Sequence, residues 1–381
     1  MRFAKERGEG DKMLKRFTVK GFKNFRDELV FDLTNVGKYS FNSDHIKNGI
    51  INKGIIYGKN GAGKSNLGEA IFDIESNLDP EKSFRNSGVY KNMFDLDQNP
   101  YFKYEFVFGN DEVVYEYRKS DPLTVIWERL WIDGEAVLTM DNDKIECNIP
   151  AAKDLNFSSK AKNLSAVLFI YRTLSGKALK HIAALVEFAQ NMLWFRSLDG
   201  DKSSLERIED CIISENKVQD FESFLRAMGL DYHLSVKEVP GIFEQGKPQK
   251  IIFANFGKND VSLNSVLSTG TESLTLFYYW SLHFKSLSFL FIDDFDAFYH
   301  YELSEKIIEI LNSNTAFQSF VTTHNTSLMN NELSRPDCLF LIGDNKIKPL
   351  KDCTAKELRE GHSLEKIYRE KGFNQLPPLN R

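Results

Sequence analysis

Hydrophobic and polar residues alternate along much of the first 140 residues, with the period of two that β-strands show. Residues 14–33 predict two such strands joined around 23–27, and residues 101–138 predict a meander with turns at 109–111 and 120–122. Alternation of this kind turns one set of side chains to a core and the other to solvent. The N-terminal part of the chain is therefore predicted to form an antiparallel β lobe.

The remaining two thirds of the chain change from helical spacing to an alternation of strands and helices. Helical spacing dominates 158–230, including one long pattern over 180–195, and strand patterns return at 232–239 and 250–255. The last third alternates between helices and apolar strands, in the order 272–286, 289–292, 302–312, 317–322, a further helix, and 338–342. This alternation is typical of an α/β fold whose parallel sheet is covered on both faces.

A glycine-rich stretch, Gly58–Gly63, is followed by Lys64 and Ser65 and lies between an apolar strand, 54–57, and a helical pattern. It matches the phosphate-binding motif GxxxxGK[ST] at every fixed position, which a chain of this length does by chance on the order of once in a hundred. Such a loop turns backbone N–H groups toward phosphate oxygens at a helix N-terminus. Lys64 then reaches the β- and γ-phosphates, and Ser65 binds Mg²⁺. The alternative is a plain glycine turn before a helix.

An apolar run at 287–292 ends in two carboxylates, Asp293 and Asp294. The run predicts a strand buried on both faces, and ligands bind at the carboxyl ends of strands in open α/β sheets. We predict that Asp293 holds Mg²⁺, directly or through water, and that Asp294 polarises the attacking water. The alternative is an acidic turn between a strand and a helix.

Two weaker signals lie on either side of these carboxylates. Ser268 and Gly270 open a helix, where they form either a second anion site or a plain helix cap. His324 follows the strand 317–322, at a position from which it would hydrogen-bond a γ-phosphate or the attacking water;. A lone histidine is more often structural, and we interpret His300 in that way.

Composition and charge narrow the class of protein. The 381 residues carry 49 Lys and Arg against 54 Asp and Glu, a net charge of −5, which disfavours bulk coating of nucleic acid but not a local basic strip;. The candidate for such a strip is a set of residues that we call the basic cluster: Lys15, Arg16, Lys20, Lys23 and Arg26. The alternative interpretation of this cluster is a solvated, charged face of a strand.

Cysteine spacing and apolar runs bear on the compartment. The four cysteines, Cys147, Cys211, Cys338 and Cys353, are far apart and form no CxxC pair. We therefore expect a reduced, cytoplasmic protein without a disulfide framework or a zinc site. No apolar run approaches the roughly 18–20 residues of a membrane span, so we expect no membrane partner. Residues 1–12 are charged and are expected to be a disordered extension rather than a signal peptide.

Several segments resemble, in this order, those of one protein family. They are VKGFKNFRDELVFDL, YGKNGAGKSN, LSTGTESL, FLFIDDFDAFYH, VTTHN and TAKELREGHSLEKIYREKGF. Together they resemble the ABC-type ATPase heads of the RecF, SMC, Rad50 and OLD group. The closer resemblance is to the bacterial AAA15-type ATPases of that group, often found in anti-phage and abortive-infection loci. The resemblance covers about 14–75 and 250–373.

The resemblance implies a fold, two cofactors and an assembly. The fold is a P-loop NTPase of ABC-head type, an α/β protein with a mixed sheet, an N-terminal antiparallel β lobe and an inserted helical subdomain. On this basis we expect a first ATPase lobe at 13–150, a helical insertion at 151–245 and a second lobe at 246–381. The cofactors are ATP and Mg²⁺. Two copies form a homodimer, alone or within a higher oligomer, and sandwich two ATPs, so that Ser268 and Gly270 cap the γ-phosphate on the opposite copy.

The predicted site residues combine the motifs with this resemblance. Residues predicted to contact the nucleotide or the metal ion are Asn24, Arg26, Asn60, Gly61, Ala62, Gly63, Lys64, Ser65, Asn66, Ser268, Gly270 and Asp293; the predicted catalytic residues are Asp294 and His324. The family usually has Glu where this chain has Asp294, and the shorter side chain predicts slow hydrolysis. Gln98 is a candidate for the family's glutamine loop by order only, and a surface glutamine is the alternative.

Four functions are compatible with such an ATPase. The motif set and the compact size favour an ATP-gated sensor or scaffold that controls an effector encoded nearby, such as a nuclease, in anti-phage defence. The main alternative is a RecF-like DNA-repair ATPase that acts directly on DNA and uses a basic strip. A self-contained nuclease is disfavoured, because little length remains beyond the ATPase and no further carboxylate cluster in a βαβ context follows residue 325. An ABC transporter subunit is disfavoured by the strand-rich N-terminal half.

Overall fold

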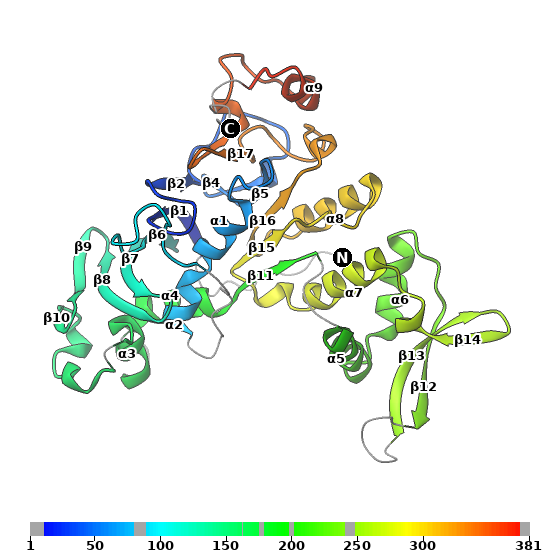
Figure 1. Ribbon diagram of the computed structural model, residues 1–381, viewed down its shortest axis with the longest axis horizontal. Coiled ribbons are helices and arrows are strands. Elements are labelled where there is room, and N and C mark those ends of the chain that lie inside the picture. The colour runs from blue at the N-terminus through cyan, green and yellow to red at the C-terminus, as the bar shows by residue number, and fades with distance from the viewer. Residues whose placement is uncertain are drawn as a thin grey trace. The chain divides into compact units, whose positions relative to one another are not determined.

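A computed structural model describes residues 11–79, 89–161, 163–174, 179–197, 202–240 and 248–373, with the backbone alone described at 202–206. The chain forms two compact units that are discontinuous in sequence (Figure 1). The first unit runs to Trp194 and resumes at Leu287–Asp293 and again from Leu311; the second consists of Phe195–Ser286 and Asp294–Ile310. The segment 151–245, predicted as one helical insertion, is divided between the units.

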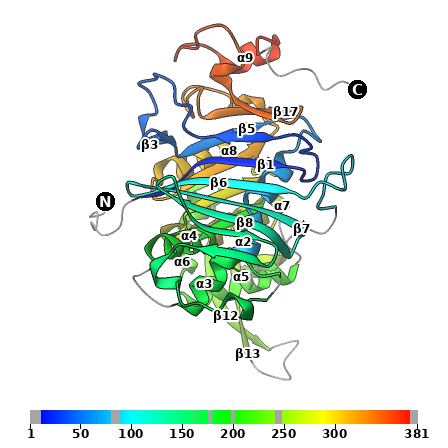
Figure 2. The same ribbon diagram turned by 90° about the vertical axis from the view of Figure 1, so that its left-hand side faces the viewer.

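The first unit contains a seven-stranded antiparallel sheet in the order β10-β9-β8-β7-β6-β1-β2. Its strands are β1 Lys12–Lys20, β2 Leu29–Asp32, β6 Tyr101–Phe108, β7 Asp111–Asp121, β8 Thr124–Ile132, β9 Glu135–Asp141 and β10 Lys144–Cys147. Figure 2 shows its long strands side by side. Buried and part-exposed side chains alternate along β6 and β7, which confirms the predicted β lobe;. Of the predicted extension 1–12, residues 1–10 lie outside the described residues, and Lys12 already belongs to β1.

Four described helices share one hydrophobic core with this sheet. They are α1 Lys64–Ile71, α2 Asp73–Leu78, α3 Ala166–Thr173 and α4 Lys180–Gln190. A buried ion pair joins α2 to β7, with Lys119 Nζ 2.8 Å from Asp73 Oδ1 and both side chains at most 1% exposed. The Tyr90 hydroxyl donates to Asp73 Oδ2 at 3.0 Å, and the Tyr117 hydroxyl donates to Oδ1 at 2.8 Å. Both charges therefore have partners that compensate for their removal from water.

The second sheet of the first unit is mixed, in the order β11-β15-β16-β5-β17-β18. Its strands are β5 Lys53–Tyr57, β11 Met192–Arg196, β15 Phe289–Asp293, β16 Gln318–Thr323, β17 Leu339–Gly343 and β18 Lys346–Pro349. The strands β15, β16, β5 and β17 are parallel, whereas β18 is antiparallel to β17. The smaller elements of this unit are β3 Ile46–Lys47, β4 Ile50–Ile51, α1 Lys64–Ile71 and α9 Leu364–Arg369. The predicted mixed α/β fold is confirmed.

Two local predictions in this unit are wrong. The helix predicted over 180–195 ends at Gln190, and the aromatic residues that follow form β11, because they are buried at the edge of the mixed sheet;. The helix expected between 322 and 338 is a single 3₁₀ turn, Thr326–Leu328. Asn325 caps this turn by accepting from the Ser327 backbone N–H at 3.1 Å;.

The second unit combines helices with a three-stranded antiparallel sheet in the order β12-β13-β14. Its elements are α5 Lys202–Ser214, α6 Val218–Ala227, β12 Leu234–Pro240, β13 Pro248–Phe256, β14 Asn259–Ser262, α7 Thr269–Ser281 and the first part of α8 Tyr301–Ser313. The rings of Phe221 and Tyr278, 4.8 Å apart, join α6 to α7. The sequence pattern did not predict β14.

In neither unit does a described helix have the length and apolar character needed to cross a bilayer.

Lys53 makes the stability of the first unit dependent on pH. Its ammonium donates to Phe317 O at 2.9 Å and to Ser319 Oγ at 3.0 Å, and burial, together with the charge of Lys47, lowers its pKa to about 7. Between that value and the ordinary lysine pKa, the unfolded chain binds a proton that the folded chain does not, so stability rises with pH. We expect the stability of Lys53→Met relative to wild type to fall by about 2 kcal/mol between pH 7 and pH 9. Urea unfolding of both proteins at each pH measures this, and an unchanged difference contradicts it.

Candidate nucleotide site

The phosphate-binding motif and two of the predicted site residues lie at one edge of the mixed sheet. β16 lies between β15 and β5, and all three strands are parallel. Asp293 ends β15, His324 follows β16, and the glycine-rich loop follows β5. The carboxyl ends of parallel strands meet at one edge of a sheet. The topology therefore brings together Gly58 and His324, which are 266 residues apart in sequence.

The loop Gly58–Gly63 changes chain direction between β5 and α1. Gly61 and Gly63 have positive φ angles of 78° and 101°. A side chain at Gly63 is also excluded by contact, since its Cβ would lie 2.6 Å from Asn24 Nδ2. Lys64 is the first residue of α1, so Gly63 directs the first backbone N–H groups of this eight-residue helix to the end of the loop;.

The turn that contains Asn24 lies directly against this loop. Asn24 Oδ1 accepts a hydrogen bond of 2.6 Å from Asn66 Nδ2, and the Phe25 ring would lie 3.1 Å from a Cβ on Gly63. The structure thus brings Asn24, Gly63 and Asn66 together, and their contact with a nucleotide stays a prediction. Phe25, which is fully buried, is a support of the loop that sequence reasoning missed.

Asp293 is fully buried at the end of β15. Its Oδ1 accepts a hydrogen bond of 2.7 Å from Thr322 Oγ1 on the adjacent strand. A carboxylate in this position has its orientation fixed by the hydroxyl and is a suitable oxygen ligand for Mg²⁺. Sequence reasoning missed the role of Thr322 as a partner of Asp293. Its position two residues before His324, near the end of the neighbouring strand, was a signal that could have indicated this role.

Lys64 and His324 are in direct contact. Lys64 Nζ lies 2.6 Å from His324 Nε2 and donates to Gly58 O at 3.2 Å, and the lysine is 6% exposed. An ammonium group has only donors, so Nε2 is the acceptor in this contact. The predicted phosphate-binding cation, Lys64, and the predicted catalytic histidine, His324, are therefore in contact at the end of the loop.

This contact predicts the effect of removing the imidazole. We expect His324→Ala to lower the rate of ATP turnover by about 10²-fold or more while changing ATP affinity by less than about tenfold, because Lys64 retains its charge. The measurements are steady-state hydrolysis and equilibrium binding. His300→Ala is the control, since His300 is 67% exposed in its side chain. Equal losses of turnover and affinity would make His324 a structural residue.

The other predicted residues of the first unit differ in their exposure. Asn60, Gly61 and Arg26 are exposed, whereas Ala62 is buried and Ser65 is half-buried next to Lys64. The Gln98 side chain lies against Gly21, where its Oε1 would be 2.9 Å from a Cβ. The assignment of Gln98 to a glutamine loop therefore stays a prediction.

Three predicted residues belong to the second unit. Asp294 has a positive φ of 46°, and its carbonyl accepts from Ala297 N at 3.1 Å and from Ser197 Oγ. Ser268 caps α7, since its Oγ accepts from Thr271 N at 3.3 Å, the geometry of the plain helix cap;. Gly270 is required by packing, because a Cβ there would lie 2.9 Å from Phe298 O. Their roles toward a nucleotide remain predictions.

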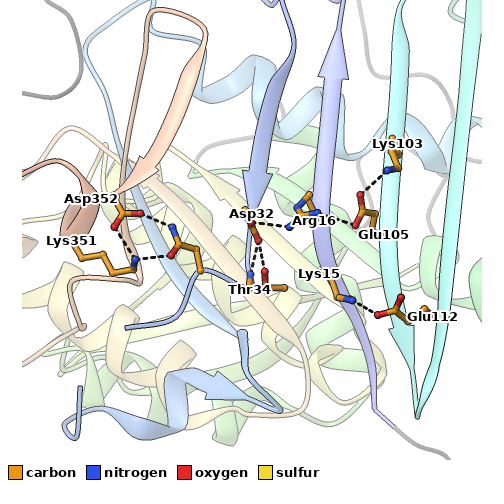
Figure 3. A network of polar contacts seen from close by, with 10 residues as sticks. Lys15, Arg16, Asp32, Thr34, Lys103, Glu105, Glu112, Lys351 and Asp352 are labelled. Carbon is orange, nitrogen blue, oxygen red and sulfur yellow. Dashed lines mark hydrogen bonds and ion pairs between the residues drawn. The ribbon is translucent and has the colours of Figure 1, made fainter. Parts of the chain in front are cut away.

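Three residues of the basic cluster, Lys15, Arg16 and Lys23, pair with acidic side chains. Figure 3 shows the pairs of Lys15 and Arg16. Lys15 pairs with Glu112 on the face of the antiparallel sheet. Arg16 lies 3.0 Å from Asp32 and 3.3 Å from Glu105. Lys23 pairs with Glu69 in the same way. Because these charges are compensated within the protein, the geometry favours a solvated charged face over a phosphate-binding strip.

A glycine-rich loop that opens a helix after a central parallel strand, with a buried carboxylate ending a nearby strand, defines a P-loop nucleotide-binding protein. The chain belongs to the family described as "AAA domain, putative AbiEii toxin, Type IV TA system", which it matches over residues 55–330. Membership of this P-loop ATPase family implies ATP binding and ATPase activity. No curated protein matches the chain.

Solved structures that are similar to the chain have low sequence identity to it. An SMC head bound to the C-winged helix domain of ScpA is 16% identical, covers 88% of this chain and 96% of its own, and gives a TM-score of 0.48. The SMC head domain from Thermotoga maritima is 17% identical, with coverages of 88% and 98% and a TM-score of 0.43. The recombination mediator RecF with ATP is 14% identical, with coverages of 89% and 99% and a TM-score of 0.41.

Proposed function

We propose that this protein binds ATP with Mg²⁺, dimerises around two nucleotides and hydrolyses them slowly. The observation that carries the proposal is the Lys64–His324 contact at the end of the P-loop, on the sheet edge where Asp293 ends its strand. Lys64 and the first N–H groups of α1 would bind the β- and γ-phosphates. Ser65 and Asp293 would hold Mg²⁺, which supplies charge neutralisation at the phosphates.

The proposed catalytic step uses Asp294 and His324. The Asp294 carboxylate would accept a proton from the attacking water. After Lys64 exchanges Nε2 for phosphate oxygens, His324 would donate a ring N–H to an oxygen of the γ-phosphate. Ser268 and Gly270 of the second copy would complete the site from the opposite side. The side chain of Asp294 is one methylene shorter than that of glutamate, and this is the reason for the slow rate.

The proposed biological role is an ATP-gated sensor or scaffold that controls an effector, such as a nuclease, in anti-phage defence. The family description, which names the AbiEii toxin, supports the link to such systems. Charge pairing on the β lobe supports this role over direct binding of DNA along the basic cluster.

The test of the biochemical proposal is ATP hydrolysis per protomer at increasing protein concentration, with Lys64→Ala as the blank. We expect the specific rate to rise with concentration, because a site completed by the second copy depends on association. Asp294→Ala should accumulate an ATP-bound dimer in sedimentation velocity. A constant rate in a range where the protein sediments as a monomer would contradict the two-copy site. Phage plating on cells that carry the locus with wild type or Lys64→Ala tests the defence role, which requires loss of protection in the variant.

A further inference from the structure

Exposed apolar side chains are concentrated in two short segments of the described chain. Ten large hydrophobic residues are exposed among all the residues that the structure describes. Six of the ten fall in the two segments: Val89, Met93, Phe94 and Leu96 in the first, and Phe298 and Tyr301 in the second. We call the set Met93, Phe94 and Leu96 the apolar loop and the pair Phe298 and Tyr301 the apolar corner. Phe94 is 84% exposed, and grouped exposure of large apolar side chains is typical of an interaction site;.

The apolar loop is held in a fixed conformation by a buried asparagine. Asn92 is 2% exposed; its backbone N–H donates to Gly21 O at 2.9 Å and its Nδ2 donates to Lys23 O at 2.6 Å. Its Oδ1 accepts from the Phe94 backbone N–H at 2.9 Å. Lys23 N in turn donates to Tyr90 O at 3.1 Å. A turn built with this many hydrogen bonds presents Phe94 to solvent as a specific feature of the fold.

The apolar loop lies next to the nucleotide site. The residues that anchor it, Gly21 and Lys23, belong to the same turn as Asn24 and Phe25, which contact Gly63 at the start of α1. Only one turn of the chain therefore separates the apolar loop from the P-loop.

The apolar corner lies next to Ser268 and Gly270, the residues of the second unit that are proposed to cap the γ-phosphate. Phe298 O lies 2.9 Å from the position of a Cβ on Gly270. The hydroxyls of Tyr299 and Ser273 are 2.6 Å apart, which ties the segment to α7. The apolar corner thus flanks the helix start that carries Ser268 and Gly270.

We propose that the apolar loop of one copy packs against the apolar corner of a second copy in the ATP-bound dimer. The inference rests on the proposed function, in which Ser268 and Gly270 of one copy face the P-loop of the other. An arrangement that joins these two motifs brings their apolar neighbours together, and a two-fold dimer makes the contact twice. Exposed Asp97 and Glu302 border the two patches and carry charges of the same sign. Burial of apolar surface therefore has to drive the contact against the repulsion between these carboxylates.

The first test is dimerisation of Phe94→Asp in sedimentation velocity with Mg²⁺ and a non-hydrolysable ATP analogue. We expect a dimer dissociation constant about ten- to a hundredfold weaker than in wild type, and a similar loss for Phe298→Asp. Binding of the analogue to the monomer should be unchanged. The matched control is Leu123→Asp, because Leu123 is 62% exposed but lies outside both patches.

The second test is cross-linking between copies. Phe94→Cys protein is mixed with Phe298→Cys protein and treated with a short bismaleimide, with Leu123→Cys mixed with Phe298→Cys as the control and wild type as the background from Cys147 and Cys211. A covalent dimer that needs the nucleotide and the Phe94→Cys partner supports the contact. If wild type dimerises but Phe94→Asp dimerises equally and no specific cross-link forms, the contact is wrong and the proposed function stands. If wild type binds the analogue without dimerising, the two-copy site and the contact both fail.

Discussion

Replacing Lys64 with alanine is expected to weaken ATP binding by about a hundred- to a thousandfold, or about 3 to 4 kcal/mol. Lys64 is buried at the first position of α1, where Gly58 O and His324 Nε2 hold its ammonium at the end of the P-loop. The charge would make two or three charge-assisted hydrogen bonds to phosphate oxygens, each stronger than a neutral one. Alanine retains the helix and removes this charge.

Isothermal titration of both proteins with ATP and Mg²⁺ measures this loss. The matched control is Lys59→Ala, because Lys59 belongs to the same loop but is exposed. The control should bind ATP within a few-fold of wild type, since an exposed lysine contributes little to the field at the phosphates. Tight, Mg²⁺-dependent binding by Lys64→Ala would contradict the assignment of the P-loop.

Replacing Lys119 with methionine is expected to destabilise the protein by about 3 kcal/mol. The substitution leaves the Asp73 carboxylate buried with two tyrosine hydroxyls and no compensating cation. Burial lowers the pKa of Lys119 against the opposing effect of the Asp73 charge, so desolvation is already costly in the wild type. Breaking such a pair costs more than removing it entirely, because the remaining charge has no counterion.

Urea unfolding of three variants measures this effect. Lys119→Met should lose the stated free energy, and the double variant Asp73→Asn with Lys119→Met should recover part of it. Lys15→Met is the matched control on the same sheet, since the Lys15–Glu112 pair is partly exposed and should be worth less than about 0.5 kcal/mol;. A single variant as stable as this control would show that the buried pair does not hold α2 on the sheet.

The central part of the site was predictable from sequence because short motifs fix its local geometry. Gly58–Ser65 required a strand before it and a helix after it, and both are present. The apolar run before Asp293 required a buried strand, and the carboxyl end of that strand lies where ligands bind in such sheets;. His324 reached the same edge because its strand is parallel to both neighbours.

The remaining features depend on contacts that leave no local signal. Met192–Arg196 continues a helical pattern, and its place beside β15 in the sheet makes it a strand. In the sequence, Lys119 looks like an ordinary polar residue near a turn. It is buried because it pairs with Asp73, which lies 46 residues earlier in the chain. The chain also leaves the first unit and returns to it twice, so composition changes along the sequence could not mark the boundaries of the units.

The position of β5 in its sheet has a consequence for synthesis of the protein. This strand carries the P-loop, but both of its neighbours, β16 and β17, come from the last 64 residues, 318–381. A nascent chain on the ribosome has the complete phosphate-binding motif long before it has the strands that order it. We therefore expect nucleotide binding to begin only after translation has passed Gly343, the end of β17.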